Sequence, residues 1–275
     1  MIISKIKKHF SIALVRLNQK KELKKLLAEK HNTLNTIVQS FCELKSNKHP
    51  TNDLRLFKEC ENYRNMLLKD KTLVSYEIFG SNNKQTVSQI CRKATSSSIW
   101  GQFLFLIIKK THTPHVLEVG TNLGVSGAYI LSALSDKDGA SFVTMEGLPM
   151  LCDIANKYFK SMKTGVRYEI IEGLYVNTFS KILNKKTKFN IAFLDGNHKK
   201  EATLMYFEHL KSIMGRPSIM IFDDINWSEG MKELWKTVIK DKKVTYSIDL
   251  FKLGIIIIDQ EANPSTKNFR LHLSY

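Results

Sequence analysis

The chain has 275 residues, of which 43% are hydrophobic and 25% are charged, a composition that suits a globular protein with a sizeable core. Its formal net charge is +16, and residues 1–48 supply half of this excess, with eleven basic residues against three acidic ones. The four cysteines are widely separated and form no C-x-x-C pair, which argues against a disulfide scaffold or a zinc site and favours a reducing cytoplasm. No early apolar run is long enough for a signal peptide or a membrane span.

The amino-terminal part is predicted to be helical. Between residues 2 and 41, apolar residues recur at near-helical spacing with lysines between them, which indicates one or two amphipathic helices. Such helices suit an anionic membrane surface, nucleic acid, an oligomer contact, or packing on their own domain, and the spacing does not decide among these. A turn-rich linker at 47–52 precedes further predicted helices near 54–67, 87–93 and 100–108.

A glycine turn follows the first predicted strand, at 116–119. Gly120 and Gly124 are spaced G-x-x-x-G, and the apolar residues after them recur at helical spacing. Glycines in such a strand-to-helix turn let a ligand approach the backbone. A dinucleotide turn needs a glycine where Asn122 stands, and the carboxylate of Glu118, expected to project into the same cleft, would repel phosphate. The predicted ligand is therefore S-adenosylmethionine (SAM), which carries an ammonium and a sulfonium and no phosphate.

Strand and helix alternate through the rest of the chain. A second predicted strand, at 141–147, ends near Glu146, where doubly wound folds place the acid that binds ribose hydroxyls. Further strands are predicted at 166–171, 189–195 and 217–223, and helices at 149–162, 178–183, 201–213 and 231–240. Two last strands, at 244–249 and 254–258, have no helix between them and are predicted to be antiparallel. The predicted fold is α/β, a Rossmann-like doubly wound sheet of about seven strands with an antiparallel last strand, plus an amino-terminal helical extension.

Two later predicted strands are also followed by acidic residues. Asp195 follows one strand and Asp223 and Asp224 follow the next, so their carboxylates are expected to converge. A hard divalent cation such as Mg²⁺ would balance three carboxylates and acidify a substrate hydroxyl. His198, whose unperturbed pKa is ~6.5, is the candidate base. The alternatives are a capping role or a contact to the donor's amino group for Asp195, loop acids at 223–224, and an exposed turn residue at His198.

These motifs resemble the class I SAM-dependent methyltransferases, whose first strand carries E/D-x-G-x-x-x-G and whose second strand ends in an acid. Trp100-Gly-Gln-Phe-Leu, the glycine turn, Asp195, and the acid pair followed by Trp227 are similar to the metal-dependent O-methyltransferases of the caffeoyl-CoA and catechol type. The phrases D-G-N-H and D-D-I-N-W-S also resemble a less characterised bacterial branch of SAM methyltransferases. The resemblance covers about residues 98–258.

The resemblance implies a role for each matching residue. Asp195, Asp223 and Asp224 fall on the family's three metal ligands, and His198 falls on a lysine that is the base in the catechol type. Ser126 falls on a serine that contacts SAM, Glu146 on the ribose acid and Gly173 beside the adenine. The predicted SAM-binding set is Glu118, Gly120, Asn122, Gly124, Ser126, Glu146, Gly147, Gly173 and Asp195. The third metal ligand is usually Asn and is Asp here, and the base position holds His instead of Lys.

Three segments are predicted: a basic helical extension at 1–48, a helical cap on the substrate side at 49–112, and a SAM-binding methyltransferase domain at 113–275. The predicted function is SAM-dependent methylation of a hydroxyl on a small or lipid-linked acceptor, assisted by Mg²⁺. The alternatives are an RNA methyltransferase using the basic extension and a non-catalytic scaffold. Nucleic acid is disfavoured, because the chain lacks an N-P-P-Y-type loop and a Pro-Cys nucleophile. The expected location is the cytoplasm, and the extension suits a second copy of the chain or the inner membrane surface.

Overall fold

The structure, a computed structural model, describes residues 2–259 and 266–273, with side chains from residue 10 onward. The chain divides into two compact units. Residues 46–192 form one unit, called the glycine-turn unit below because it contains Gly120 and Gly124. Residues 1–45 and 193–275 form the other, called the terminal unit.

The glycine-turn unit contains three parallel strands, β3 (His115–Val119), β4 (Ser141–Glu146) and β5 (Arg167–Glu172). Every residue of β4 is buried, as expected for a strand with neighbours on both sides. Four helices accompany these strands: α5 (Ser98–Lys110), α6 (Val125–Leu134), α7 (Pro149–Met162) and α8 (Tyr175–Leu183). All ten residues of α6 are buried, so the helix that follows the glycine turn lies in the core of this unit. The predicted alternation of strand and helix is confirmed here.

Two further helices of this unit, α3 (Thr51–Leu67) and α4 (Val87–Ala94), were also expected from the sequence. A capping box starts α4, because the Thr86 side chain accepts from the Gln89 backbone while the Gln89 side chain accepts from the Thr86 backbone. The sequence did not predict the small antiparallel sheet of β1 (Leu73–Ser75) and β2 (Lys84–Thr86), nor the 3₁₀ turn η1 (Glu77–Phe79) between them. Strands of three residues are too short to show alternation.

The terminal unit contains α9 (Lys200–Ile213), β7 (Met214–Phe222), α10 (Glu229–Val238), β8 (Tyr246–Asp249), β9 (Gly254–Ile258) and β10 (Lys267–Arg270). The predicted antiparallel pair is confirmed, since β9 runs antiparallel to both β8 and β7. At Gly254 a Cβ atom would lie 2.6 Å from a ring carbon of Trp235, so only glycine lets α10 approach this strand. The sequence did not predict β10, a largely exposed strand parallel to β8.

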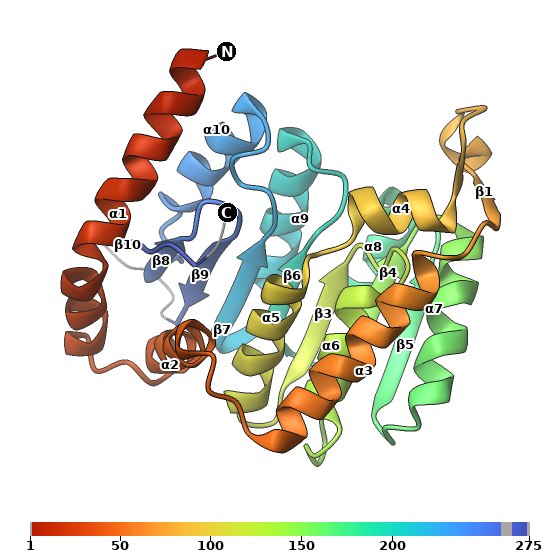
Figure 1. Cartoon of the computed structure of the whole chain (residues 1–275), viewed down its shortest axis with the longest axis horizontal. Coiled ribbons are helices and arrows are strands. Elements are labelled where there is room, and N and C mark those ends of the chain that lie inside the picture. Colours follow the sequence, from red (N-terminus) through yellow and green to blue (C-terminus); the bar gives the residue numbers. More distant parts are fainter. Residues whose placement is uncertain (1, 260–265, 274–275) are drawn as a thin grey trace. The chain divides into compact units, whose positions relative to one another are not determined.

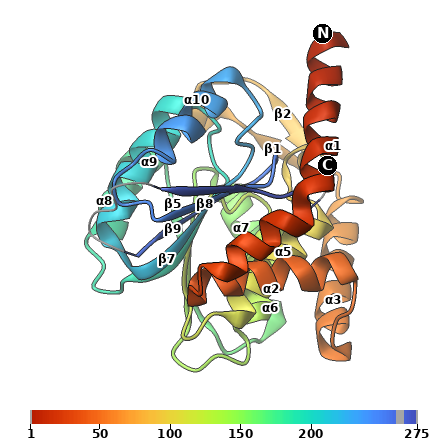
Figure 2. The same cartoon turned by 90° about the vertical axis from the view of Figure 1, so that its left-hand side faces the viewer.

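The amino-terminal segment forms two helices, α1 (Ile2–Ala28) and α2 (Asn32–Ser46), which confirms the helical prediction. Figure 1 shows α1 beside β10, and Figure 2 labels both amino-terminal helices in a second view. Arg16 donates from Nε to Nδ1 of His272 at 3.2 Å, and Gln19 accepts from the backbone of His272 at 2.9 Å. Among the described residues, no helix is both long enough and apolar enough to cross a membrane.

The strand order of the eight-stranded sheet is β10-β8-β9-β7-β6-β3-β4-β5, and the boundary between the compact units falls inside β6 (Phe189–Leu194). The sequence predicted about seven strands, and β10 is the additional one. The strands are mostly parallel and alternate with helices, with β9 running in the opposite direction. The predicted α/β class and Rossmann-like architecture are confirmed.

Candidate active site

The glycine turn is fixed by backbone geometry that other residues do not adopt readily. Gly120 has φ +110° and donates its N–H to the Met145 carbonyl at 3.1 Å, so the end of β3 is held against the end of β4. Gly124 has φ +76° and caps the start of α6. A Cβ atom at Gly124 would lie 2.9 Å from the Cβ of Ala155, so a side chain here would push α7 away. The G-x-x-x-G spacing therefore reflects both conformation and close packing.

Glu118 is fully buried in the structure. Its Oε2 accepts from the Thr144 hydroxyl at 2.7 Å, and Thr144 in turn lies 2.6 Å from the Thr121 hydroxyl. Its Oε1 has no hydrogen-bond partner in the described part of the chain. Burial raises the pKa of Glu118 to about 7, although the nearby Ser126 and Thr144 hydroxyls oppose the rise. An unpaired carboxylate oxygen in this position fits a positively charged ligand.

Glu146, the acid that ends β4, is held by backbone N–H groups. One oxygen accepts from Asn122 at 2.8 Å and the other accepts from Leu148 at 3.0 Å, while only 7% of the residue is exposed. Burial raises the pKa of Glu146, and the backbone N–H groups of Leu148, Asn122 and Gly147 partly offset this effect. The Gly173 N–H donates to the Glu146 carbonyl at 2.9 Å, with φ +127° at Gly173. The structure thus brings the predicted residues of β3, β4 and β5 together.

Asn122 stabilises the glycine turn, and both polar atoms of its side chain are already hydrogen-bonded. Its φ is +49°, a conformation that Asn tolerates better than most residues. Its Nδ2 donates to the Ala94 carbonyl at 2.9 Å, and its Oδ1 accepts from the Leu123 backbone at 2.7 Å. Ser126, another predicted SAM contact, is 6% exposed and lies in the first turn of α6. Sequence reasoning missed Tyr63, whose hydroxyl donates to the Leu123 carbonyl at 2.6 Å from 60 residues away.

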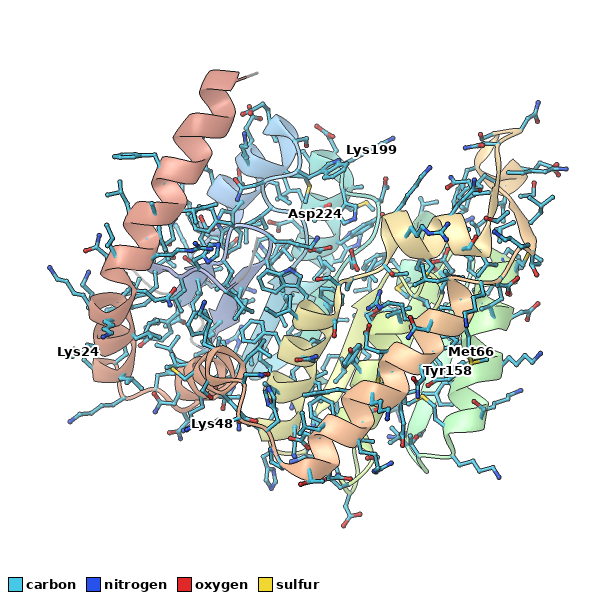
Figure 3. The ribbon with its side chains drawn as sticks, in the orientation of Figure 1. Lys24, Lys48, Met66, Tyr158, Lys199 and Asp224 are labelled. Atoms are coloured by element: carbon cyan, nitrogen blue, oxygen red, sulfur yellow. The ribbon has the colours of Figure 1, made fainter. Side chains whose placement is uncertain are left out.

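The glycine-turn unit also holds a cavity of about 600 Å³ between α3 and α7. Tyr63 and Tyr158 stack in it with ring centroids 3.5 Å apart, and Met66 and Lys163 also line it. Figure 3 labels Met66 and Tyr158 at this place. None of the predicted site residues lines this cavity.

In the terminal unit, the predicted catalytic and metal-binding acids gather at the ends of β6 and β7. The Asp223 N–H donates to the Leu194 carbonyl at 3.0 Å, which places Asp223 near Asp195. Ligand atoms of Asp195, His198 and Asp223 all lie within 4.8 Å of one another, and His198 Nε2 lies 3.5 Å from Asp195 Oδ1. Asp224 has φ +52° and is not part of that group. The structure therefore brings together Asp195, the predicted base and Asp223.

Lys252 is a residue of this cluster that sequence reasoning missed. Its Nζ lies 2.9 and 3.1 Å from the two carboxylate oxygens of Asp223 and 2.7 Å from Oδ1 of Asp224. Burial alone would lower the pKa of Lys252, but the carboxylates of Asp223 and Asp224 outweigh it, so the pKa is raised. Lys252 lies in the turn between β8 and β9, so only the hairpin's folding brings it to these acids. No motif around position 252 signalled this contact.

The residues present do not fit the predicted three-acid magnesium site. Mg²⁺ requires carboxylate oxygens at about 2.0–2.1 Å, and both Asp223 oxygens and one Asp224 oxygen already contact the Lys252 ammonium. Two unit charges at roughly 4 Å interact by about 4 kcal/mol near a protein surface, and a divalent ion doubles that repulsion. An Mg²⁺ ion at these three acids would therefore compete directly with the Lys252 ammonium.

Comparison with known proteins finds one family model and several solved structures that are similar to this chain. Residues 117–225 match a family model described as a methyltransferase domain. An O-methyltransferase from Bacillus cereus, in complex with SAH, has 21% identity and a TM-score of 0.52 over 61% of this chain and 84% of that chain. TomG, an O-methyltransferase from Streptomyces achromogenes in complex with SAM, has 16% identity and a TM-score of 0.53 over 61% and 82%.

A third solved structure covers more of the chain. The SAH-bound methyltransferase PaMTH1 from Podospora anserina has 15% identity and a TM-score of 0.57 over 81% of this chain and 94% of that chain. No curated protein sequence matches the chain. The solved structures share the fold of this chain, and the matched methyltransferase domain spans 109 of its 275 residues. Over the parts that align, the chain is similar to methyltransferases whose structures hold SAM or SAH.

Proposed function

We propose that the chain transfers the methyl group of SAM to a hydroxyl of a small or lipid-linked acceptor. The observation that carries this proposal is the fully buried Glu118, whose Oε1 has no hydrogen-bond partner in the described residues next to a glycine turn. A buried acceptor without a partner is costly, and a cationic ligand would complete it. The O-methyltransferases that share this fold support an oxygen acceptor.

Three features of the glycine-turn unit would hold the donor. The Glu118 carboxylate balances the donor's positive charge, the backbone at Gly120 and Gly124 admits close approach, and Glu146 accepts from ribose hydroxyls. When bound, SAM supplies an electrophilic methyl group on a sulfonium. The backbone N–H groups that hold Glu146 keep its carboxylate oriented before the ligand arrives, which lowers the entropy cost of binding.

His198 is the proposed proton acceptor for the hydroxyl. As the oxygen–methyl bond forms, the methyl–sulfur bond breaks, the sulfur keeps the electron pair, and the hydroxyl proton passes to the imidazole. The Asp195 carboxylate, 3.5 Å from His198 Nε2, stabilises the imidazolium that results. The side chain of His198 is 31% exposed, so a substrate can reach it from solvent.

The donor half is tested by calorimetric titration of SAM into the wild-type chain and into Glu118→Ala, with the exposed Glu172→Ala as the matched control. Binding that is lost in Glu118→Ala and kept in the control is expected. No binding of SAM to the wild-type chain, with binding of NADH instead, would refute the proposal.

The acceptor half is tested by incubating the chain with SAM and a panel of phenols, catechols and lipid-linked alcohols, and measuring SAH by mass spectrometry. His198→Ala should lose turnover by about 10² to 10⁴-fold, the usual range for a general base. His112→Ala, which removes an exposed histidine, should retain it. Equal turnover in both variants would remove His198 from the mechanism.

A further inference from the structure

We infer that the Lys252 ammonium supplies the positive charge that balances Asp223 and Asp224, in place of the divalent cation predicted from the sequence. This inference rests on the proposed function, because it concerns the same acid cluster. It holds that methyl transfer by this chain needs no added metal, and that a divalent cation is kept out by an ammonium already bound to the ligand oxygens.

The Lys252 ammonium contacts carboxylate oxygens of two acids. Both oxygens of Asp223 and one oxygen of Asp224 lie within 3.1 Å of Nζ. Only 5% of the Asp223 side chain is exposed, so its charge needs a partner inside the protein. The lysine side chain is 33% exposed, which leaves it reachable from solvent while its ammonium is held.

The backbone around Lys252 keeps the ammonium in place. The Leu250 N–H donates to the Leu253 carbonyl at 2.9 Å and closes a tight turn. The Lys252 carbonyl accepts from the Ile225 N–H at 3.1 Å, and the Phe251 carbonyl accepts from the Asn226 side chain at 2.7 Å. The hairpin turn is therefore attached to the loop that carries the acids, and the two cannot separate without breaking these bonds.

The three side chains that could together bind a metal ion include Asp223, one of the two acids that Lys252 contacts. Asp195, His198 and Asp223 form that group among the described residues, and both Asp223 oxygens contact Lys252. A cation bound to this group would either displace the Lys252 ammonium or bind the same Asp223 carboxylate at a short distance from it. Removing the ammonium should therefore expose a cation site that the wild-type chain hides.

The test is a titration of Mn²⁺ alone, followed by calorimetry and by the electron paramagnetic resonance of free Mn²⁺. Lys252→Met removes the charge and keeps most of the side-chain volume, and Lys252→Arg keeps the charge. Lys199→Met is the matched control, because Lys199 is an exposed lysine of the same unit (Figure 3). Lys252→Met is expected to bind Mn²⁺ at least about tenfold more tightly than the other three proteins, since a unit charge beside the ion is removed.

Wild-type binding of Mn²⁺ as tight as that of Lys252→Met would overturn the inference, whether both are tight or both weak. If Lys252→Met does not fold, Lys252→Met with Asp224→Asn removes one charge of each sign, and it is compared with Asp224→Asn alone. SAM is titrated into each protein as well. Failure of SAM binding in the wild-type chain counts against the proposed function, whereas normal SAM binding with tight wild-type Mn²⁺ binding counts against Lys252 alone.

A separate observation concerns the outer face of α1. Three large apolar side chains are exposed at helical spacing, Phe10 at 66%, Leu14 at 44% and Leu17 at 81%. The same stripe continues with two exposed lysines, Lys21 and Lys24, and Figure 3 labels Lys24 on the outer side of the helix. The opposite face is already used, because Ile12 and Leu26 are buried and Arg16 and Gln19 contact His272.

We propose that this stripe, Phe10, Leu14, Leu17, Lys21 and Lys24, binds an anionic lipid surface. Apolar side chains followed by lysines suit the acyl boundary and the phosphate groups of a bilayer. Between Phe10 and Ala28 the sequence has one acid, Glu22, and it is paired with Lys25 at 3.1 Å. A symmetric dimer through this stripe would bring two lysine clusters of the same sign together, which disfavours a second copy as the occupant.

Sedimentation with vesicles of phosphatidylcholine, or of an equal mixture with phosphatidylglycerol, tests this surface. The full chain should bind the mixed vesicles and not the neutral ones, and Lys21→Gln with Lys24→Gln should weaken binding by about fivefold for each lysine. Phe10, Leu14 and Leu17 changed to Ser should abolish binding. The control changes Leu54, Met66 and Val176, which are exposed apolar residues of the glycine-turn unit, to Ser. Equal loss in the control, no binding to mixed vesicles, or a dimer that the triple Ser variant dissolves would overturn the proposal.

Discussion

Replacing Glu118 with glutamine should make the protein more stable above neutral pH and leave its stability nearly unchanged in acid. Burial raises the pKa of Glu118 from the usual 4.5 to about 7. Between these two values the folded chain holds a proton that the unfolded chain has released. The stabilisation from that proton is fully present below pH 4.5 and is lost as the pH rises through about 7. The difference corresponds to about 3 kcal/mol, at 1.36 kcal/mol for each unit of pKa.

Urea unfolding at about pH 5 and about pH 8 measures this difference. Glu118→Gln has no charge to bury, so its stability relative to wild type should increase by about 3 kcal/mol between the two conditions. Glu172→Gln, at an exposed acid that ends β5, serves as the matched control and should show no comparable trend. A flat difference between Glu118→Gln and wild type would show that Glu118 does not titrate as its burial requires.

The same residue links SAM binding to protons. A cationic ligand beside Oε1 favours the ionised carboxylate, so Glu118 should release a proton when SAM binds near neutral pH. Calorimetry in two buffers with different ionisation enthalpies measures that proton. A heat of binding that is independent of the buffer in wild type would contradict contact between the donor and this acid.

Three further predictions concern packing and stability. Gly127→Ala should lower the free energy of unfolding by about 1–3 kcal/mol, since its Cβ would overlap the Phe159 ring, and normal urea stability would argue against this packing. Tyr63→Phe should cost about 1–2 kcal/mol, because the Leu123 carbonyl loses its donor, and an unchanged melting temperature would contradict it. Lys252→Met should cost about 1–3 kcal/mol, less than loss of a fully buried ion pair because the lysine is one-third exposed, and a stability gain in urea would refute the pairing.

The sequence predicted those parts of the fold that depend on local pattern. The alternation of strand and helix from 113 to 258 needed only hydrophobic periodicity and the positions of glycine and proline, and the bounds of β4 and α7 agree with prediction at nearly every residue. β1, β2 and β10 were missed because each is three or four residues long and polar in part. Periodicity cannot be read from so few positions.

The parts of the site that the sequence did not predict are long-range contacts. Lys252 reaches Asp223 and Asp224 across 28 or 29 positions, and Tyr63 reaches Leu123 across 60. Neither residue lies in a motif, and lysine and tyrosine are common in this chain. A metal cation was predicted from the sequence because three acids needed a balancing positive charge. It could not identify which lysine the hairpin would bring to that place.

Three buried acids at the ends of strands show why residue type alone is a weak guide to chemistry. Glu118 is satisfied by one hydroxyl and keeps one oxygen unpaired, Glu146 is satisfied by backbone N–H groups, and Asp223 is satisfied by an ammonium. Oδ1 of Asp223 also lacks a hydrogen bond, but the Lys252 ammonium lies 2.9 Å from it, whereas no cation is paired with Oε1 of Glu118 in the described residues. Glu118 is therefore the acid of these three that best fits a cationic ligand. A carboxylate that already has its partner can orient or stabilise, but it has less to gain from a second cation. The partner each acid has found in the fold therefore decides which one binds the donor.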